Sequence, residues 1–90
     1  MDSTKQLELI DCRPAVRRMA LLMEQKLREK DAAHPNGWEF DSFSTLYKRM
    51  LEEAGELIEA EGVNQRAMEC VDVANMALML CDKCLWNYGK

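Results

Sequence analysis

Two pairs of acidic residues have the spacing of a divalent metal site. Glu53 and Glu56 are three residues apart, and after a gap of twelve residues Glu69 and Asp72 are again three apart. Residues with this spacing are neighbours on one face of a helix. If the chain reverses direction between the pairs, four carboxylates converge, and their mutual repulsion favours a bound cation. The pattern therefore predicts a metal site.

The ligand types in this group favour a hard cation. Mg²⁺ and Mn²⁺ prefer oxygen ligands, whereas zinc sites are built mainly from His and Cys. Di-iron bundles use Glu-x-x-His pairs, and here the second member of each pair is a carboxylate. We therefore expect Mg²⁺, with Mn²⁺ as the alternative ion. The competing interpretation of the four acids is a solvated face with salt bridges to bases such as Lys48 and Arg49.

The elements that must position these acids are helices. Pro14 suits the first position of a helix, and apolar residues recur at a spacing of three to four from there to about Lys30. The turn sequence His34-Pro35-Asn36-Gly37 ends this pattern. Residues 1–13 are interpreted as an N-terminal lead-in to one helical domain that spans residues 14–90.

Two further helices are predicted to form a hairpin. Ser42 is a suitable N-cap for the second helix, which carries the first acidic pair. Gly62 is expected to end that helix and Asn64 to cap the third, which runs from about Gln65 to Leu85. Because no strand-like alternation occurs, the predicted fold class is all-α with three helices.

The acids of the two pairs differ in position from their acidic neighbours. On the second helix, Glu53 and Glu56 lie on one shoulder of the apolar stripe. Glu52 and Glu59 fall on the solvent side of the same helix. The second pair forms, with Asn75, the only polar track in the middle of a largely apolar third helix. Carboxylates in such a setting need a partner, because burying an unpaired charge is costly.

Length and composition indicate one small domain that associates with copies of itself. The 90 residues are 48% hydrophobic, which is more apolar surface than a monomer of this size can cover. A homodimer or homotetramer is expected, in which helix hairpins from two chains complete a four-helix bundle. The formal net charge of −4, with no dense cluster of bases, argues against binding to a nucleic acid polymer.

The sequence shows no feature of export or membrane insertion. Its polar start is unlike a signal peptide, and the longest apolar run, Met76–Cys81, is too short to cross a membrane. We therefore expect a cytoplasmic protein without a membrane partner. Four cysteines fit a reducing compartment. The CxxC spacing of Cys81 and Cys84 lacks a second pair, which favours core packing or surface thiols over zinc binding or redox use.

The acidic pattern resembles the signature of the MazG-like superfamily of all-α nucleoside triphosphate pyrophosphohydrolases. That signature is ExxE followed, after a variable gap, by ExxD. It stands here as Glu53-Ala54-Gly55-Glu56 and Glu69-Cys70-Val71-Asp72, with Glu52 preceding the first motif. Residues 23–27, the Gly37-Trp38 loop and residues 72–80 are similar to those of compact bacterial and phage members. The resemblance covers roughly residues 16–85.

The resemblance implies hydrolysis of a ribo- or deoxyribonucleoside triphosphate to the monophosphate and pyrophosphate, which clears non-standard or surplus nucleotides. Mg²⁺ held by the four acids of the two motifs would bind the triphosphate and polarise the α-phosphorus for attack by water. Either Glu53 or Glu52 would orient or deprotonate that water. The alternatives are a non-catalytic helical interaction module that keeps the scaffold, and a hydrolase similar to phosphoribosyl-ATP pyrophosphatase.

Three further residues are candidates for substrate binding. Trp38 either stacks on a nucleobase or packs over the helix ends. Asn75 either hydrogen-bonds to sugar or phosphate, or forms a buried polar contact between helices. Lys26, Lys48 and Lys83 are each interpreted as a surface lysine or, alternatively, as a phosphate contact; Lys83, roughly two to three turns beyond Asp72, is favoured among them for phosphate.

Overall fold

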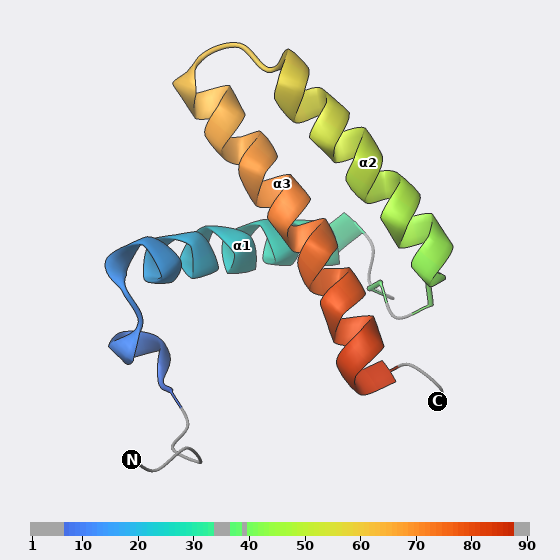
Figure 1. Ribbon diagram of the computed structural model, residues 1–90, viewed down its shortest axis with the longest axis horizontal. Helices are drawn as coiled ribbons and strands as arrows, with labels where there is room; N and C mark the ends of the chain where they lie inside the picture. The colour runs from blue at the N-terminus through green and yellow to red at the C-terminus, as the bar shows by residue number, and fades with distance from the viewer. Residues whose placement is uncertain (1–6, 34–36, 39, 88–90) are drawn as a thin grey trace.

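A computed structural model describes residues 7–33, 37–38 and 40–87 of the chain. In this part of the chain every regular element is helical. The elements are, in order, a 3₁₀ turn η1 (Leu9–Asp11), three α-helices α1 (Pro14–Ala33), α2 (Phe43–Glu59) and α3 (Val63–Asp82), and a π-helical turn η2 (Lys83–Asn87). Helices α2 and α3 form an antiparallel hairpin, and α1 crosses α3 (Figure 1). The predicted all-α class with three helices is confirmed.

The start of α2 follows the predicted capping pattern. The Ser42 hydroxyl oxygen accepts a hydrogen bond from the backbone N–H of Thr45 at 3.1 Å. This bond satisfies one of the N–H groups that the first turn of a helix leaves without an intrahelical partner. The cap therefore fixes where α2 begins, and with it the register of the acids that follow.

The turn between α2 and α3 differs from the prediction by a few residues. Helix α2 ends at Glu59, and Gly62 directly precedes α3 at the N-cap position, so Asn64 lies inside α3. Gly62 has φ +85°, a left-handed conformation that other residues rarely adopt, and it turns the chain in a very short connection. Arg66 ties the two helix ends together, because its Nε donates to the carbonyl oxygen of Ala60 at 3.3 Å. The C-terminal ends of α1 and α3 also differ from the prediction. Helix α1 continues past Lys30 to Ala33, and α3 ends at Asp82, before Leu85, where η2 follows.

The buried core is small and lies between α3 and its two neighbours. Its cluster of buried side chains is Leu46, Met76, Met79 and Leu80, against which Leu27, Trp38, Met50 and Leu78 pack. Helix α1 has no buried residue, and its apolar side chains Val16, Leu21 and Leu22 are exposed. Three of the four cysteines, Cys70, Cys81 and Cys84, are exposed thiols, so the core-packing alternative does not apply to them in a single chain. Among the described residues, no helix combines the length and apolar character that crossing a bilayer requires.

Candidate metal centre

Three of the four predicted carboxylates converge between α2 and α3. Glu53 comes from α2, and Glu69 and Asp72 come from successive turns of α3. One oxygen of each lies within 4.8 Å of an oxygen of the other two, and all three side chains are half-buried. These three residues are called the acidic triad below. The antiparallel hairpin produces this convergence, because it sets the middle of α2 beside the first half of α3 (Figure 1).

The acidic triad leaves oxygen atoms buried without donors. Oε2 of Glu53, Oε2 of Glu69 and Oδ1 of Asp72 are inaccessible to solvent, and none has a hydrogen-bond partner within the described part of the chain. A buried acceptor without a donor costs about 1–3 kcal/mol, and more when it is charged. Such groups are rare in folded proteins, and an ion is one of the common reasons for them. A hard divalent cation is a chemical fit to three oxygen donors with no thiol or imidazole among them.

The surroundings of Glu53 in the acidic triad shift the pKa of its carboxyl group. The pKa of Glu53 is raised from 4.5 to about 7, first by burial and then by the negative charges of Glu56 and Asp72. A side-chain hydrogen bond with Glu56 acts in the same direction, whereas the nearby Lys30 ammonium opposes it. Near neutral pH the metal-free site therefore shares a proton that a divalent cation would have to displace.

The two remaining acids of the motif lie at the solvent side of the site. Glu56 is exposed one turn beyond Glu53, outside the 4.8 Å group but close enough to influence the Glu53 carboxyl. Glu52 is also exposed, and as the sequence neighbour of Glu53 it points about 100° away around the helix. Of the four predicted acids, three converge in a single chain, and the fourth, Glu56, lies exposed on the solvent side of these three.

Two lysines of α1 lie beside the acidic triad, a position that was not predicted from the sequence. Lys26 Nζ lies 3.8 Å from Asp72 Oδ1, and Lys30 is close enough to Glu53 to lower its pKa. Lys26 is therefore half-buried and paired with the acidic triad rather than freely exposed. The spacing of four residues between Lys26 and Lys30 shows in the sequence that the two lysines share one face of α1. The sequence did not predict that this face lies beside the acids of α3.

Asn75 joins α1 to α3 beside the site. Its side chain is fully buried, and its Nδ2 donates to the carbonyl oxygen of Met23 at 3.2 Å. The predicted alternative of a buried polar contact between helices is therefore present. Its Oδ1 has no hydrogen-bond partner among the residues that the structure describes.

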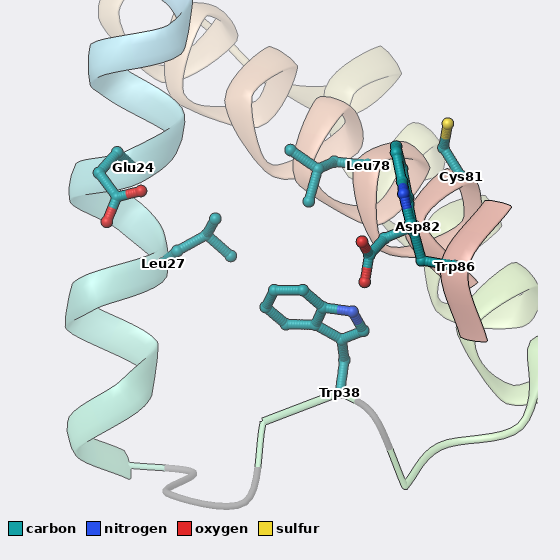
Figure 2. Close-up of a pocket in the computed structure, with 7 residues that line it drawn as sticks. All are labelled: Glu24, Leu27, Trp38, Leu78, Cys81, Asp82 and Trp86. Atoms are coloured by element: carbon teal, nitrogen blue, oxygen red, sulfur yellow. The ribbon is translucent and has the colours of Figure 1, made fainter. Parts of the chain in front are cut away.

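Trp38 lines an open cavity on the far part of α3. The cavity has a volume of about 590 Å³ and is formed by Glu24, Leu27, Trp38, Leu78, Cys81, Asp82 and Trp86 (Figure 2). The Trp38 indole also packs against the core, and its buried Nε1 finds no hydrogen-bond partner in the described residues. Lys83 lies in η2, eleven residues after Asp72, which is roughly 16 Å along a helix. The candidate substrate residues therefore lie at increasing distances along α3 from the acidic triad.

No protein-family model, curated protein or solved structure matches the chain.

Proposed function

We propose that the protein is a Mg²⁺-dependent nucleoside triphosphate pyrophosphohydrolase of the MazG-like type. The reaction would convert a ribo- or deoxyribonucleoside triphosphate and water to the monophosphate and pyrophosphate. The observation that carries the proposal is the acidic triad, with ligand oxygens within 4.8 Å of one another and buried oxygens that lack donors. The paired ExxE and ExxD motifs are the second support.

Glu53, Glu69 and Asp72 would hold the ion, and Glu56 can complete the set from its exposed position. When bound, Mg²⁺, or Mn²⁺ in its place, supplies charge neutralisation and polarisation of the triphosphate. Redox iron and zinc are disfavoured, because the triad contains neither histidine nor cysteine.

Glu53 is favoured over Glu52 as the residue that accepts a proton from the attacking water. A general base must lie within reach of the attacking water, and Glu53 is the carboxylate of α2 that faces the other two acids of the triad. Glu52 is exposed on another side of α2. The water oxygen would bond to the α-phosphorus as the bond to the leaving pyrophosphate breaks, and the water proton would pass to the carboxylate.

The substrate would extend from the acidic triad along α3. The apolar cavity beside Trp38 suits a nucleobase, which an indole can stack against. Asn75 has its Nδ2 committed to Met23, so a sugar or phosphate donor would have to reach its Oδ1. Lys83 is the candidate for a more distant anionic contact.

The exposed apolar side chains support assembly with a second copy of the chain. Ile58 on α2 and Val63 at the start of α3 are 85% and 79% exposed, and Leu51 is 54% exposed. Large apolar surfaces of this kind are usually covered in an assembly. A homodimer or homotetramer, with hairpins paired into a four-helix bundle, would cover them. Free thiols and a nucleotide substrate both fit the cytoplasm.

The test is pyrophosphate release from a panel of ribo- and deoxyribonucleoside triphosphates in the presence of Mg²⁺. Release from at least one nucleotide is expected, together with its loss in EDTA and in Asp72→Asn. The matched control is Glu59→Gln, which removes an exposed acid at the end of α2 and should leave turnover unchanged. If the protein binds Mg²⁺ but releases no pyrophosphate from any nucleotide, the non-catalytic interaction module is the better assignment.

A further inference from the structure

Helix α1 presents two ammonium groups to the acidic triad. Lys26 and Lys30 are four residues apart, so they share one face of the helix. Lys26 Nζ lies 3.8 Å from Asp72 Oδ1, and Lys30 acts on Glu53. Both lysines are half-buried. Positive charge from a third helix therefore already lies beside the oxygens that would hold a metal ion.

The contact between Lys26 and Asp72 is an ion pair without a hydrogen bond. The 3.8 Å separation is too long for a hydrogen bond, and Asp72 Oδ1 is among the buried atoms that lack a donor. The Lys26 side chain is 29% exposed, against 16% for Asp72, so the lysine can rotate toward solvent more easily than the carboxylate. The ammonium group thus compensates the charge of Asp72 without satisfying its oxygen.

Helix α1 has contacts with the rest of the fold besides this ion pair. The fully buried Asn75 donates to the carbonyl oxygen of Met23, and Leu27 packs against the core. These contacts hold the backbone of α1 against α3 on either side of Lys26. The ammonium group can therefore move while its helix remains docked.

We propose that Lys26 is a tethered counter-ion that a divalent cation displaces from Asp72, and that the released ammonium group then binds a phosphate oxygen of the anion accompanying the cation. The inference rests on the proposed function, because it requires a divalent ion at the acidic triad. A divalent ion and an ammonium group repel strongly within a few ångströms. A phosphate anchored to the ion supplies negative charge beside the position that the ammonium group leaves. One lysine would thus oppose metal binding alone and favour binding of metal together with phosphate.

The experiment is calorimetric titration of the folded protein, first with Mn²⁺ or Mg²⁺ and then with inorganic pyrophosphate at saturating metal. Lys26→Met is compared with Lys48→Met, which removes an exposed lysine of α2 and measures the general effect of losing one positive charge. Relative to that control, Lys26→Met should bind the metal about 3- to 10-fold more tightly. It should bind pyrophosphate about tenfold more weakly. Lys26→Arg, which keeps the charge, should move both affinities back toward the wild type.

The opposite changes in metal affinity and pyrophosphate affinity distinguish this role of Lys26 from a structural one. If Lys26 only holds α1 in place, Lys26→Met should weaken metal and pyrophosphate binding together and lower the melting temperature measured by circular dichroism. Metal affinity equal to that of Lys48→Met, or unchanged pyrophosphate affinity, would overturn the inference and leave the proposed function standing. Absence of metal binding by the wild type would overturn both.

Discussion

Replacing Glu53 by Gln should stabilise the metal-free protein at alkaline pH and have little effect at pH 4.5. The pKa of the Glu53 carboxyl rises from 4.5 to about 7 on folding, first because of burial and then because of the charges of Glu56 and Asp72. A carboxyl with a raised pKa in the folded state binds its proton more tightly there than in the unfolded chain. Ionisation of Glu53 therefore lowers the free energy of unfolding progressively between pH 4.5 and about 7, and by a constant amount above that.

The size of the effect follows from the same pKa difference. At about 1.4 kcal/mol per pKa unit, the rise from 4.5 to about 7 corresponds to an upper limit of about 3.5 kcal/mol. Because Glu53 is partly exposed to water, the expected gain for Glu53→Gln at pH 8 is reduced to about 1–2 kcal/mol. An amide has nearly the shape of the carboxyl and cannot ionise, so the packing around it is retained.

The assay is urea unfolding followed by circular dichroism at pH 4.5 and pH 8, with EDTA present throughout. The control is Glu59→Gln, which removes an exposed charge from the same helix and should change the free energy of unfolding by less than about 0.5 kcal/mol at either pH. Destabilisation of Glu53→Gln at pH 8 would mean that the carboxylate is a structural partner in the fold. An effect of equal size at both pH values would refute the argument from ionisation.

Three further outcomes are expected. At a concentration of about 100 times the dissociation constant, Mg²⁺ should raise the free energy of unfolding by about 2.7 kcal/mol in the wild type and not in Asp72→Asn, measured by urea titration. Asn75→Ala should lower it by about 1–3 kcal/mol in the same assay, because the α1–α3 hydrogen bond to Met23 is lost. Ile58→Asp should leave the fold of one chain intact, since the side chain is 85% exposed, but should reduce the mass of the assembly measured by light scattering. An unchanged mass would place the subunit contact elsewhere.

The features predicted well from the sequence are those that local rules determine. Ser42 caps α2 because its hydroxyl needs only a backbone N–H three residues away. The acids of α3 share a face because helix geometry fixes their spacing, and the hairpin brings Glu53 to them. The convergence of the triad needed one assumption beyond local structure, namely that the chain reverses between the two motifs.

The features that were missed depend on how helices cross. The contact of Lys26 with Asp72 exists because α1 turns one particular face to α3, and the apolar spacing of α1 does not specify that face sharply. No residue of α1 is fully buried, so its pattern of apolar residues is a weak guide to its orientation. The turn was misplaced for a different reason, since a glycine with positive φ can follow one helix or precede the next.

The acidic triad and the small core act on stability in opposite directions. Half-buried carboxylates that repel one another weaken the fold, whose core cluster in the described part of the chain is small and consists of Leu46, Met76, Met79 and Leu80. The fold limits this penalty in two ways, by a proton held on Glu53 near neutral pH and by the ammonium group of Lys26 beside Asp72. A divalent cation would replace both, because it competes with the proton and repels the lysine. Metal affinity should therefore fall as the pH drops below 7, where protonation of Glu53 opposes the ion most strongly.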